Sequence, residues 1–266
     1  MVEPSPVLTS EKSSGRCTIT LRRPEIHNAL NDALIDGLAE AVTTAGADEA
    51  VRYLVIAGEG KSFCAGADLT WMRSVIDASI EENKADAARL VVALEAMLHC
   101  PKPVIGRVHG AALGGGMGLV AACDLVVAAP RAQFGLTEVR LGLAPAMIFP
   151  FLLRKVQRQH LLWAALTGER FRADRALELG LVNQVAEDLD SVIDGWAQAL
   201  LQAGPAALDA VKQLFDRVPQ LGWEEARAFT VDLIARLRCG PEGQDGMRAF
   251  LERRKPHWLE APAGSR

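Results

Sequence analysis

Glu138 is the best candidate for a proton-transfer group, because of the residues that surround it in the sequence. It lies in residues 132–145, AQFGLTEVRLGLAP, where most of the neighbours are apolar. A carboxylate in such surroundings loses hydration, and its pKa rises towards a value useful to a general acid or base. The alternative is a glutamate at the start of a helix or in a salt bridge with Arg140, and the pattern alone leaves these interpretations open.

Two glycine-rich segments follow short β-branched runs and could bind an anionic or carbonyl group. They are residues 61–69, KSFCAGADL, and residues 108–118, VHGAALGGGMG, whose three consecutive glycines precede an apolar helical stretch. Small residues let backbone N–H groups face a ligand, and the helix after the glycines would present its positive N-terminus. Neither segment has the GxxxxGK[ST] pattern, which disfavours a nucleotide triphosphatase. A tight turn is the alternative for each.

The cysteines and histidines are scattered. The five cysteines form no C-x-x-C pair and the five histidines form no H-x-x-x-H pair. We therefore expect reduced thiols and no metal site. A catalytic Cys64 with His109 as its base is a second chemical hypothesis.

Composition limits the classes of partner. The chain has 266 residues, of which 50% are hydrophobic and 23% charged, so it can bury a large core. A net charge of -4 lacks the basic excess of a nucleic-acid-binding protein. The first ten residues have no signal-peptide pattern, and no run reaches the ~18 apolar residues of a membrane helix. We expect a cytoplasmic protein with neither nucleic acid nor membrane as a partner.

The elements that must position these residues alternate as in α/β proteins. Strand-like runs at residues 16–21, 51–57, 104–108 and 124–128 are each next to a helical pattern or a glycine-rich turn, which predicts a mostly parallel sheet. From about residue 191 only helical patterns remain, at residues 193–203, 206–217, 224–238 and 241–252. We therefore divide the chain into a catalytic core, residues 1–190, and a helical region, residues 191–266.

In order along the chain, these motifs resemble the crotonase (enoyl-CoA hydratase/isomerase) superfamily. The matching segments are residues 23–30, 63–69, 114–116, 122–124, 134–145, 166–169, 176–185 and 246–254. The resemblance implies a spiral of ββα repeats and C-terminal helices that hold homotrimers, often paired as hexamers. It also implies an acyl-CoA substrate and no cofactor beyond the CoA moiety of that substrate.

The resemblance also implies roles for individual residues. The backbone N–H groups of Ala67 and Gly115 match the oxyanion hole, and Glu138 matches one of two acid/base glutamates. Coenzyme A binding is implied for Lys61, Ala65, Asp68 and Leu69 and, from the C-terminal helix or a neighbouring subunit, for Phe250 and Arg253. The implied acyl pocket contains Trp71, Met72, Gly114, Gly118 and Ala146.

Gly118 stands where two-glutamate hydratases carry their second carboxylate. One carboxyl group can still serve a syn elimination, because one oxygen takes the α-proton while the other donates to the leaving hydroxyl. Residues 64–73 and 137–148 look like the bacterial methylglutaconyl-CoA hydratase branch of leucine degradation. We therefore expect a carbon–oxygen lyase that interconverts 3-methylglutaconyl-CoA and 3-hydroxy-3-methylglutaryl-CoA. Candidates to bind the distal carboxylate are Arg73, Arg107 and Arg140.

Two alternatives within the superfamily stay open. One is a Δ3,Δ2-enoyl-CoA isomerase, in which Glu138 alone moves a proton between two carbons. The other is a non-catalytic CoA-binding homologue, against which the retention of Glu138 and of both loops argues.

Overall fold

The larger of two β-sheets forms the framework of the core. The computed structural model describes residues 8–259. The strand order in this sheet is β1-β2-β3-β4-β6-β9, with β1 antiparallel to β2 and every other pair parallel. The strands are β1 (Leu8–Ser13), β2 (Arg16–Leu21), β3 (Tyr53–Gly58), β4 (Val104–Val108), β6 (Leu125–Ala128) and β9 (Gln184–Val185). The predicted mostly parallel sheet is confirmed.

The second, smaller sheet has three strands. Its members are β5 (Ala112–Leu113), β7 (Gln133–Gly135) and β8 (Arg170–Arg172). β7 is parallel to β5 and antiparallel to β8. An isolated bridge from Cys64 to Ala112 joins the loop after β3 to this sheet. The two glycine-rich segments therefore run side by side.

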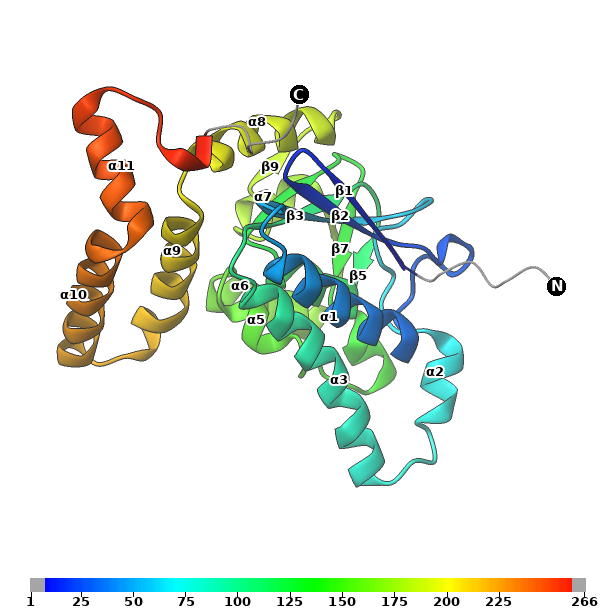
Figure 1. The fold of residues 1–266 in the computed structure, drawn as a ribbon. Helices are drawn as coiled ribbons and strands as arrows, with labels where there is room; N and C mark the ends of the chain where they lie inside the picture. The colour runs from blue at the N-terminus through cyan, green and yellow to red at the C-terminus, as the bar shows by residue number, and fades with distance from the viewer. Residues whose placement is uncertain (1–7, 260–266) are drawn as a thin grey trace.

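Helices cover both faces of the larger sheet, as alternation along its strands requires. Leu54 and Ile56 of β3 belong to the main core cluster with α1 and α3, while Val55 packs with Ile193 of α8 on the opposite face. Figure 1 shows α8 above the strands and α1 and α3 below them. The core helices are α1 (Asp32–Ala47), α2 (Leu69–Ser74), α3 (Ile80–Leu98), α4 (Gly115–Ala122), α5 (Phe149–Leu153), α6 (Arg158–Thr167), α7 (Ala173–Glu178) and α8 (Leu189–Gln202). Short 3-10 helices are η1 (Pro24–Ile26), η2 (Thr137–Leu141), η3 (Val218–Gln220) and η4 (His257–Leu259).

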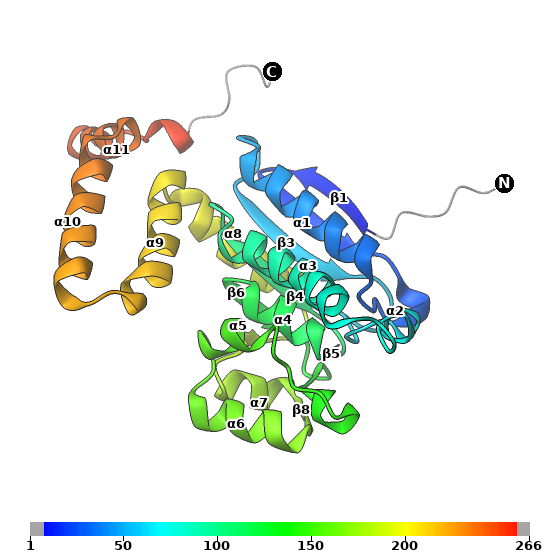
Figure 2. The same cartoon turned by 90° about the horizontal axis from the view of Figure 1, so that it is seen from below.

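Three C-terminal helices project away from the core (Figures 1 and 2). They are α9 (Pro205–Arg217), α10 (Trp223–Cys239) and α11 (Pro241–Glu252), and they match the helical patterns at residues 206–217, 224–238 and 241–252. The first predicted helix of the C-terminal region, at residues 193–203, is α8, which packs on the sheet. The projecting part therefore begins after α8.

The projecting helices expose large apolar side chains. Phe215, Trp223 and Phe250 are 77%, 80% and 85% exposed in the single chain. Between residues 8 and 259, no helix combines the length and the hydropathy that crossing a membrane requires.

Candidate active site

The loop that follows β3 is held in place by the segment ahead of α1. Leu30 N donates to Gly66 O at 2.7 Å, and Asp68 N donates to Leu30 O at 2.9 Å. This is a parallel bridge between Leu30 and Ala67. In an extended segment successive N–H groups point to opposite sides, so the N–H of Ala67 points away from Leu30. No acceptor among the described residues pairs with it.

Two buried polar interactions fix this loop. Asn28 is fully buried and donates to the carbonyl oxygens of Glu59 and Ser62 at 2.9 and 2.8 Å. Arg23 pairs with Asp68 at 2.7 Å. Burial acts to raise the pKa of Asp68, but hydrogen bonds from the Thr70 N–H and from Arg23 outweigh it and hold the pKa below its ordinary value. Asp68 thus stays ionised and also caps α2.

The second glycine-rich loop supplies another free backbone donor. Gly114 has a φ of +48°, which favours glycine, and it ends the loop at the start of α4. Gly115 is the first residue of α4, so its N–H has no intrahelical acceptor. A Cβ atom at Gly66 would lie 3.8 Å from Gly115 N, so the two loops are close neighbours. The N–H groups of Ala67 and Gly115 therefore belong to adjoining backbone segments.

Glu138 lies directly against the glycine loop. A Cβ atom added to Gly114 would be 3.2 Å from Glu138 Oε1, so a side chain at residue 114 would crowd the carboxyl group. Glu138 Oε2 is buried and has no hydrogen-bond partner among the described residues. Burial is the main cause of a raised pKa, against a smaller lowering by the residue's own backbone N–H. The desolvated carboxyl group expected from sequence is confirmed. Glu138 also lies in the first turn of the 3-10 helix η2, but the described residues show no ion pair between it and Arg140.

One cavity brings the loops and the carboxyl group together. It has a volume of about 780 Å³ and lies between the two loops, η2, and the helices α2 and α3. Of the residues singled out from the sequence, its lining contains Ala65, Ala67, Leu69, Trp71, Met72, Gly114, Gly115 and Glu138. The two residues with free backbone donors and the Glu138 carboxyl group thus line one chamber.

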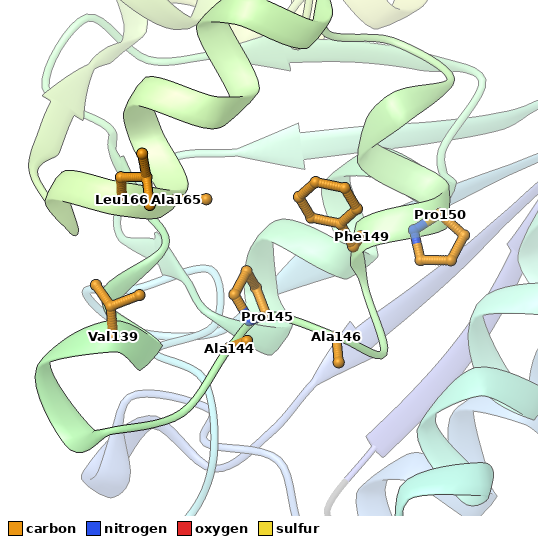
Figure 3. Close-up of a pocket in the computed structure, with 8 residues that line it drawn as sticks. All are labelled: Val139, Ala144, Pro145, Ala146, Phe149, Pro150, Ala165 and Leu166. Carbon is orange, nitrogen blue, oxygen red and sulfur yellow. The ribbon is translucent and has the colours of Figure 1, made fainter.

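Other predicted site residues lie outside that lining. Lys61 is exposed on the loop, and Asp68 is engaged with Arg23. Ala146 lines a neighbouring apolar cavity of about 380 Å³ (Figure 3), which shares Ala144 and Pro145 with the first. Their roles in binding substrate stay predictions.

Gly118 is buried behind the cavity wall. A Cβ atom there would meet Ile148 Cγ2 at 2.4 Å and Leu94 Cδ1 at 3.3 Å. Ile148 itself lines the cavity. The place from which a second carboxylate would extend is therefore filled by an apolar side chain.

The sequence did not indicate that α3 contributes to the cavity. Asn83, Asp86 and Leu90 of α3 line the chamber, and Trp71 Nε1 donates to Asp86 Oδ1 at 2.7 Å. Their spacing of three and four along α3 was the available signal, but it does not reveal which face of α3 meets the site.

None of the arginines considered for a distal carboxylate lines the cavity. Arg107 instead makes two hydrogen bonds to Asp190, at 3.1 and 2.8 Å.

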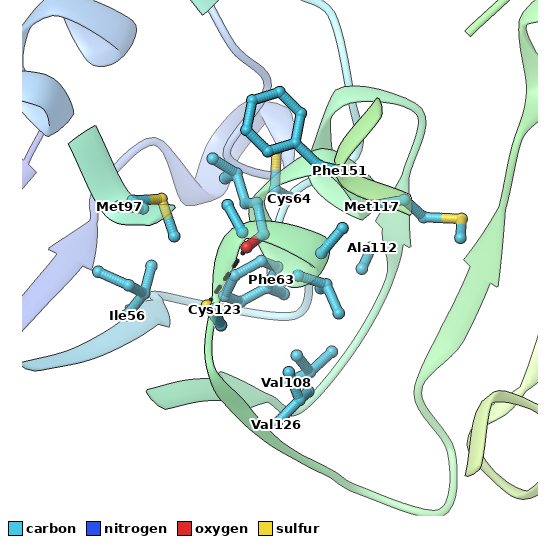
Figure 4. Packing of buried hydrophobic residues seen from close by; sticks show 14 of the residues in the cluster. Ile56, Phe63, Cys64, Met97, Val108, Ala112, Met117, Cys123, Val126 and Phe151 are labelled. Atoms are coloured by element: carbon cyan, nitrogen blue, oxygen red, sulfur yellow. Dashed lines mark hydrogen bonds between the residues drawn. The ribbon is translucent and has the colours of Figure 1, made fainter. Parts of the chain in front are cut away.

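Cys64 belongs to the core rather than to the site. Figure 4 shows it among apolar side chains that include Phe63 and Met117. Burial raises the pKa of its thiol to about 12, so the thiol is protonated at neutral pH. His109 Nε2 lies 2.9 Å from Gly60 O. This arrangement does not provide an activated cysteine nucleophile.

Two free backbone donors beside a desolvated carboxyl group can polarise a carbonyl and move a proton next to it. A family model described as enoyl-CoA hydratase/isomerase matches residues 11–261. The chain belongs to the enoyl-CoA hydratase/isomerase family. This match confirms the resemblance to the superfamily. The narrower resemblance to the methylglutaconyl-CoA hydratase branch stays a prediction.

Other members of the enoyl-CoA hydratase/isomerase family align with nearly the whole chain. A putative enoyl-CoA hydratase of Thermus thermophilus is 34% identical over 242 residues, which cover 90% of this chain and 96% of the relative. A mevalonyl-coenzyme A hydratase of Aspergillus fumigatus is 35% identical over 247 residues, 90% of each chain. The crystal structure of an enoyl-CoA hydratase from Shewanella pealeana has a TM-score of 0.92 and 36% identity, over 95% of this chain and 96% of that one. The predicted crotonase fold is confirmed.

Proposed function

We propose that the protein is an enoyl-CoA hydratase-type lyase that adds water to, or removes it from, a short acyl-CoA through an enolate. The observation that carries the proposal is the shared chamber of the Ala67 and Gly115 N–H groups and the unpaired Glu138 carboxyl group. Each oxyanion donor is typically worth about 3 kcal/mol in the transition state.

The proposed hydration uses one carboxylate twice. Ionised Glu138 takes a proton from water while the water oxygen bonds to C3 of the enoyl thioester. The C2–C3 π electrons move towards C1, and the charge that gathers on the thioester oxygen is stabilised by the N–H groups of Ala67 and Gly115. C2 of the enolate then takes the proton from Glu138, and the carbonyl re-forms. Dehydration is the reverse, with Glu138 ionised at the start of either direction.

A substrate with a methyl branch at C3 suits a site with one carboxyl group. An alkyl substituent aids cleavage of the C3–oxygen bond, so a second carboxylate beside the leaving water is less necessary. Ile148 offers an apolar wall where that second group would stand. The relative from Aspergillus fumigatus is named a mevalonyl-CoA hydratase, and mevalonyl-CoA bears its hydroxyl on such a branched carbon.

The pair 3-methylglutaconyl-CoA and 3-hydroxy-3-methylglutaryl-CoA also has a branched C3 and is the narrower hypothesis. Its support is the sequence of residues 64–73 and 137–148. The cavity lining contains no Lys, Arg or His for the distal carboxylate of that pair. A cation for it would have to come from residues beyond this lining.

The proposed contacts to coenzyme A include residues of the C-terminal part. Phe250 and Arg253 lie on the projecting C-terminal part, at the opposite side of the molecule from α2 (Figure 1). We propose that they reach coenzyme A on a neighbouring subunit of a trimer or a hexamer.

A Δ3,Δ2-enoyl-CoA isomerase is the alternative, because the same donors and carboxyl group could move a proton between C2 and C4. The test is turnover of crotonyl-, 3-methylcrotonyl-, 3-methylglutaconyl- and a Δ3-enoyl-CoA, with products separated by mass. A gain of 18 mass units with the first three substrates supports the hydratase. Isomerisation of the Δ3 substrate without any hydration would instead show that the protein is an isomerase. Binding without turnover would indicate a non-catalytic homologue.

A further inference from the structure

The helices α2 and α3 build one wall of the cavity. Asn83, Asp86, Ala87 and Leu90 follow the helical repeat, so they form one face of α3 towards the chamber. The Leu90 end of this face meets the oxyanion loop, since a Cβ atom at Gly115 would be 3.7 Å from Leu90 Cδ2. Asp86 is one turn further, about 6 Å along the axis. It is therefore placed to face the acyl tail rather than the thioester carbonyl.

Trp71 fixes the orientation of Asp86. Its Nε1 donates to Asp86 Oδ1 at 2.7 Å, and both side chains are half-buried in the cavity lining. The indole N–H is a donor only, so Asp86 Oδ1 is the acceptor of this hydrogen bond. No described residue donates to Asp86 Oδ2, which leaves that oxygen as a free acceptor.

The charged side chains of the cavity lining have one sign. Glu138 and Asp86 are the ionisable side chains among its lining residues. Nearby cations of α3 are paired elsewhere, Lys84 with Glu81 at 2.9 Å and Arg89 with Asp36 at 2.7 Å. A substrate carboxylate in this chamber would face like charge with no cation in the cavity lining, and such repulsion is strong where water is partly excluded.

We infer that Asp86, held by Trp71, makes the cavity select acyl thioesters whose tail ends in an uncharged hydrogen-bond donor, such as a primary hydroxyl, over those that end in a carboxylate. This inference rests on the proposed function. It narrows the substrate class, and it places 3-methylglutaconyl-CoA and 3-hydroxy-3-methylglutaryl-CoA among the thioesters that the cavity disfavours. The free Oδ2 atom accepts the hydroxyl hydrogen bond, and the charge of Asp86 rejects the carboxylate.

A matched pair of substrates tests the inference. Mevalonyl-CoA and 3-hydroxy-3-methylglutaryl-CoA have the same branched C3 and differ at C5, which is a primary alcohol in the first and a carboxylate in the second. The dehydration kcat/KM of the wild type should favour mevalonyl-CoA by about tenfold or more. Asp86→Asn should lower this ratio by about tenfold, and Trp71→Phe should lower it less.

Glu81→Gln is the control, because it removes a charge from the same helix at a side chain that is 81% exposed and outside the cavity lining. It should leave the ratio unchanged. A ratio that Asp86→Asn does not alter would overturn the inference. An equal fall of kcat on both substrates in Asp86→Asn would also overturn it, because Asp86 would then act in the chemistry.

Binding separates failure of the inference from failure of the proposed function. The affinities of both thioesters for the Glu138→Gln variant, with and without Asp86→Asn, are measured by calorimetry. If the wild type turns over neither substrate but the binding ratio depends on Asp86, the proposed function fails and the selectivity stands. If binding shows no preference for the alcohol, the selectivity fails.

Discussion

Ile148 occupies the space next to Gly118: its Cγ2 atom lies 2.4 Å from the position that a Cβ atom at residue 118 would take. Ile148 is also nearly fully buried, so it cannot move aside into solvent. The glycine and the isoleucine are therefore a matched pair. Together they exclude a carboxylate from the wall beside α4 and leave Glu138 as the carboxyl group next to the backbone of Gly114.

The first prediction concerns this pair. Gly118→Ala should destabilise the fold by ~1–3 kcal/mol, the usual cost of overpacking a tight core. The same change should cost less in an Ile148→Ala background, because the clash is relieved. Urea denaturation measures both. Gly37→Ala, where the new Cβ meets nothing within 4 Å, is the control and should not destabilise. Strictly additive effects at 118 and 148 would contradict the pairing.

Glu138→Gln should lower kcat by ~100-fold or more, as loss of a general acid/base does, while acyl-CoA binding persists. Gln keeps the size of the side chain, so circular dichroism should be unchanged. Near wild-type turnover would show that another group transfers the proton.

The raised pKa of Glu138 has consequences for both rate and stability. Activity requires the ionised form, so kcat/KM should fall on acidification with a midpoint above the ordinary carboxyl value of 4.5. Because the folded state binds this proton more tightly than the unfolded state, the contribution of Glu138 to stability decreases as the pH rises from 4.5 through the raised pKa. At neutral pH, Glu138→Gln should therefore have a Tm equal to or above that of the wild type. A lower Tm would contradict the desolvation argument.

Gly115→Val should lower kcat by ~100-fold or more. Its Cβ would lie 2.7 Å from Leu30 Cδ1, so Leu30 and the donor loop must shift. Gly195→Ala, in α8 with nothing within 4 Å, is the control for a helical glycine and should retain full activity. Normal kcat in a folded Gly115→Val variant would disprove the oxyanion assignment.

The chain should sediment as a trimer or a hexamer at micromolar concentration. Exposed Phe215, Trp223 and Phe250 leave a large apolar surface on the projecting helices, which association would bury. Trp223→Glu should weaken this association, seen as a smaller sedimentation coefficient. A monomeric wild type would refute the prediction.

Sequence alone determined the parts of this protein that depend on local pattern. The runs that became β3, β4 and β6 and the helices α9, α10 and α11 follow from residue type and spacing. The small residues of the two loops indicated accessible backbone donors, and the family resemblance pointed to Ala67 and Gly115. The ordered motifs also identified the superfamily. Glu138 was found because its neighbours in sequence are apolar.

Tertiary structure decided the features that join distant segments. Whether Glu138 pairs with Arg140 or stays unpaired depended on η2 lying against Gly114, which is 24 residues earlier. The side chain that fills the space beside Gly118 comes from Ile148. A second carboxylate of the cavity lining comes from Asp86 on a separate helix, α3. A sequence pattern records which face of a helix is apolar, but the partner of that face is set by packing across the whole core.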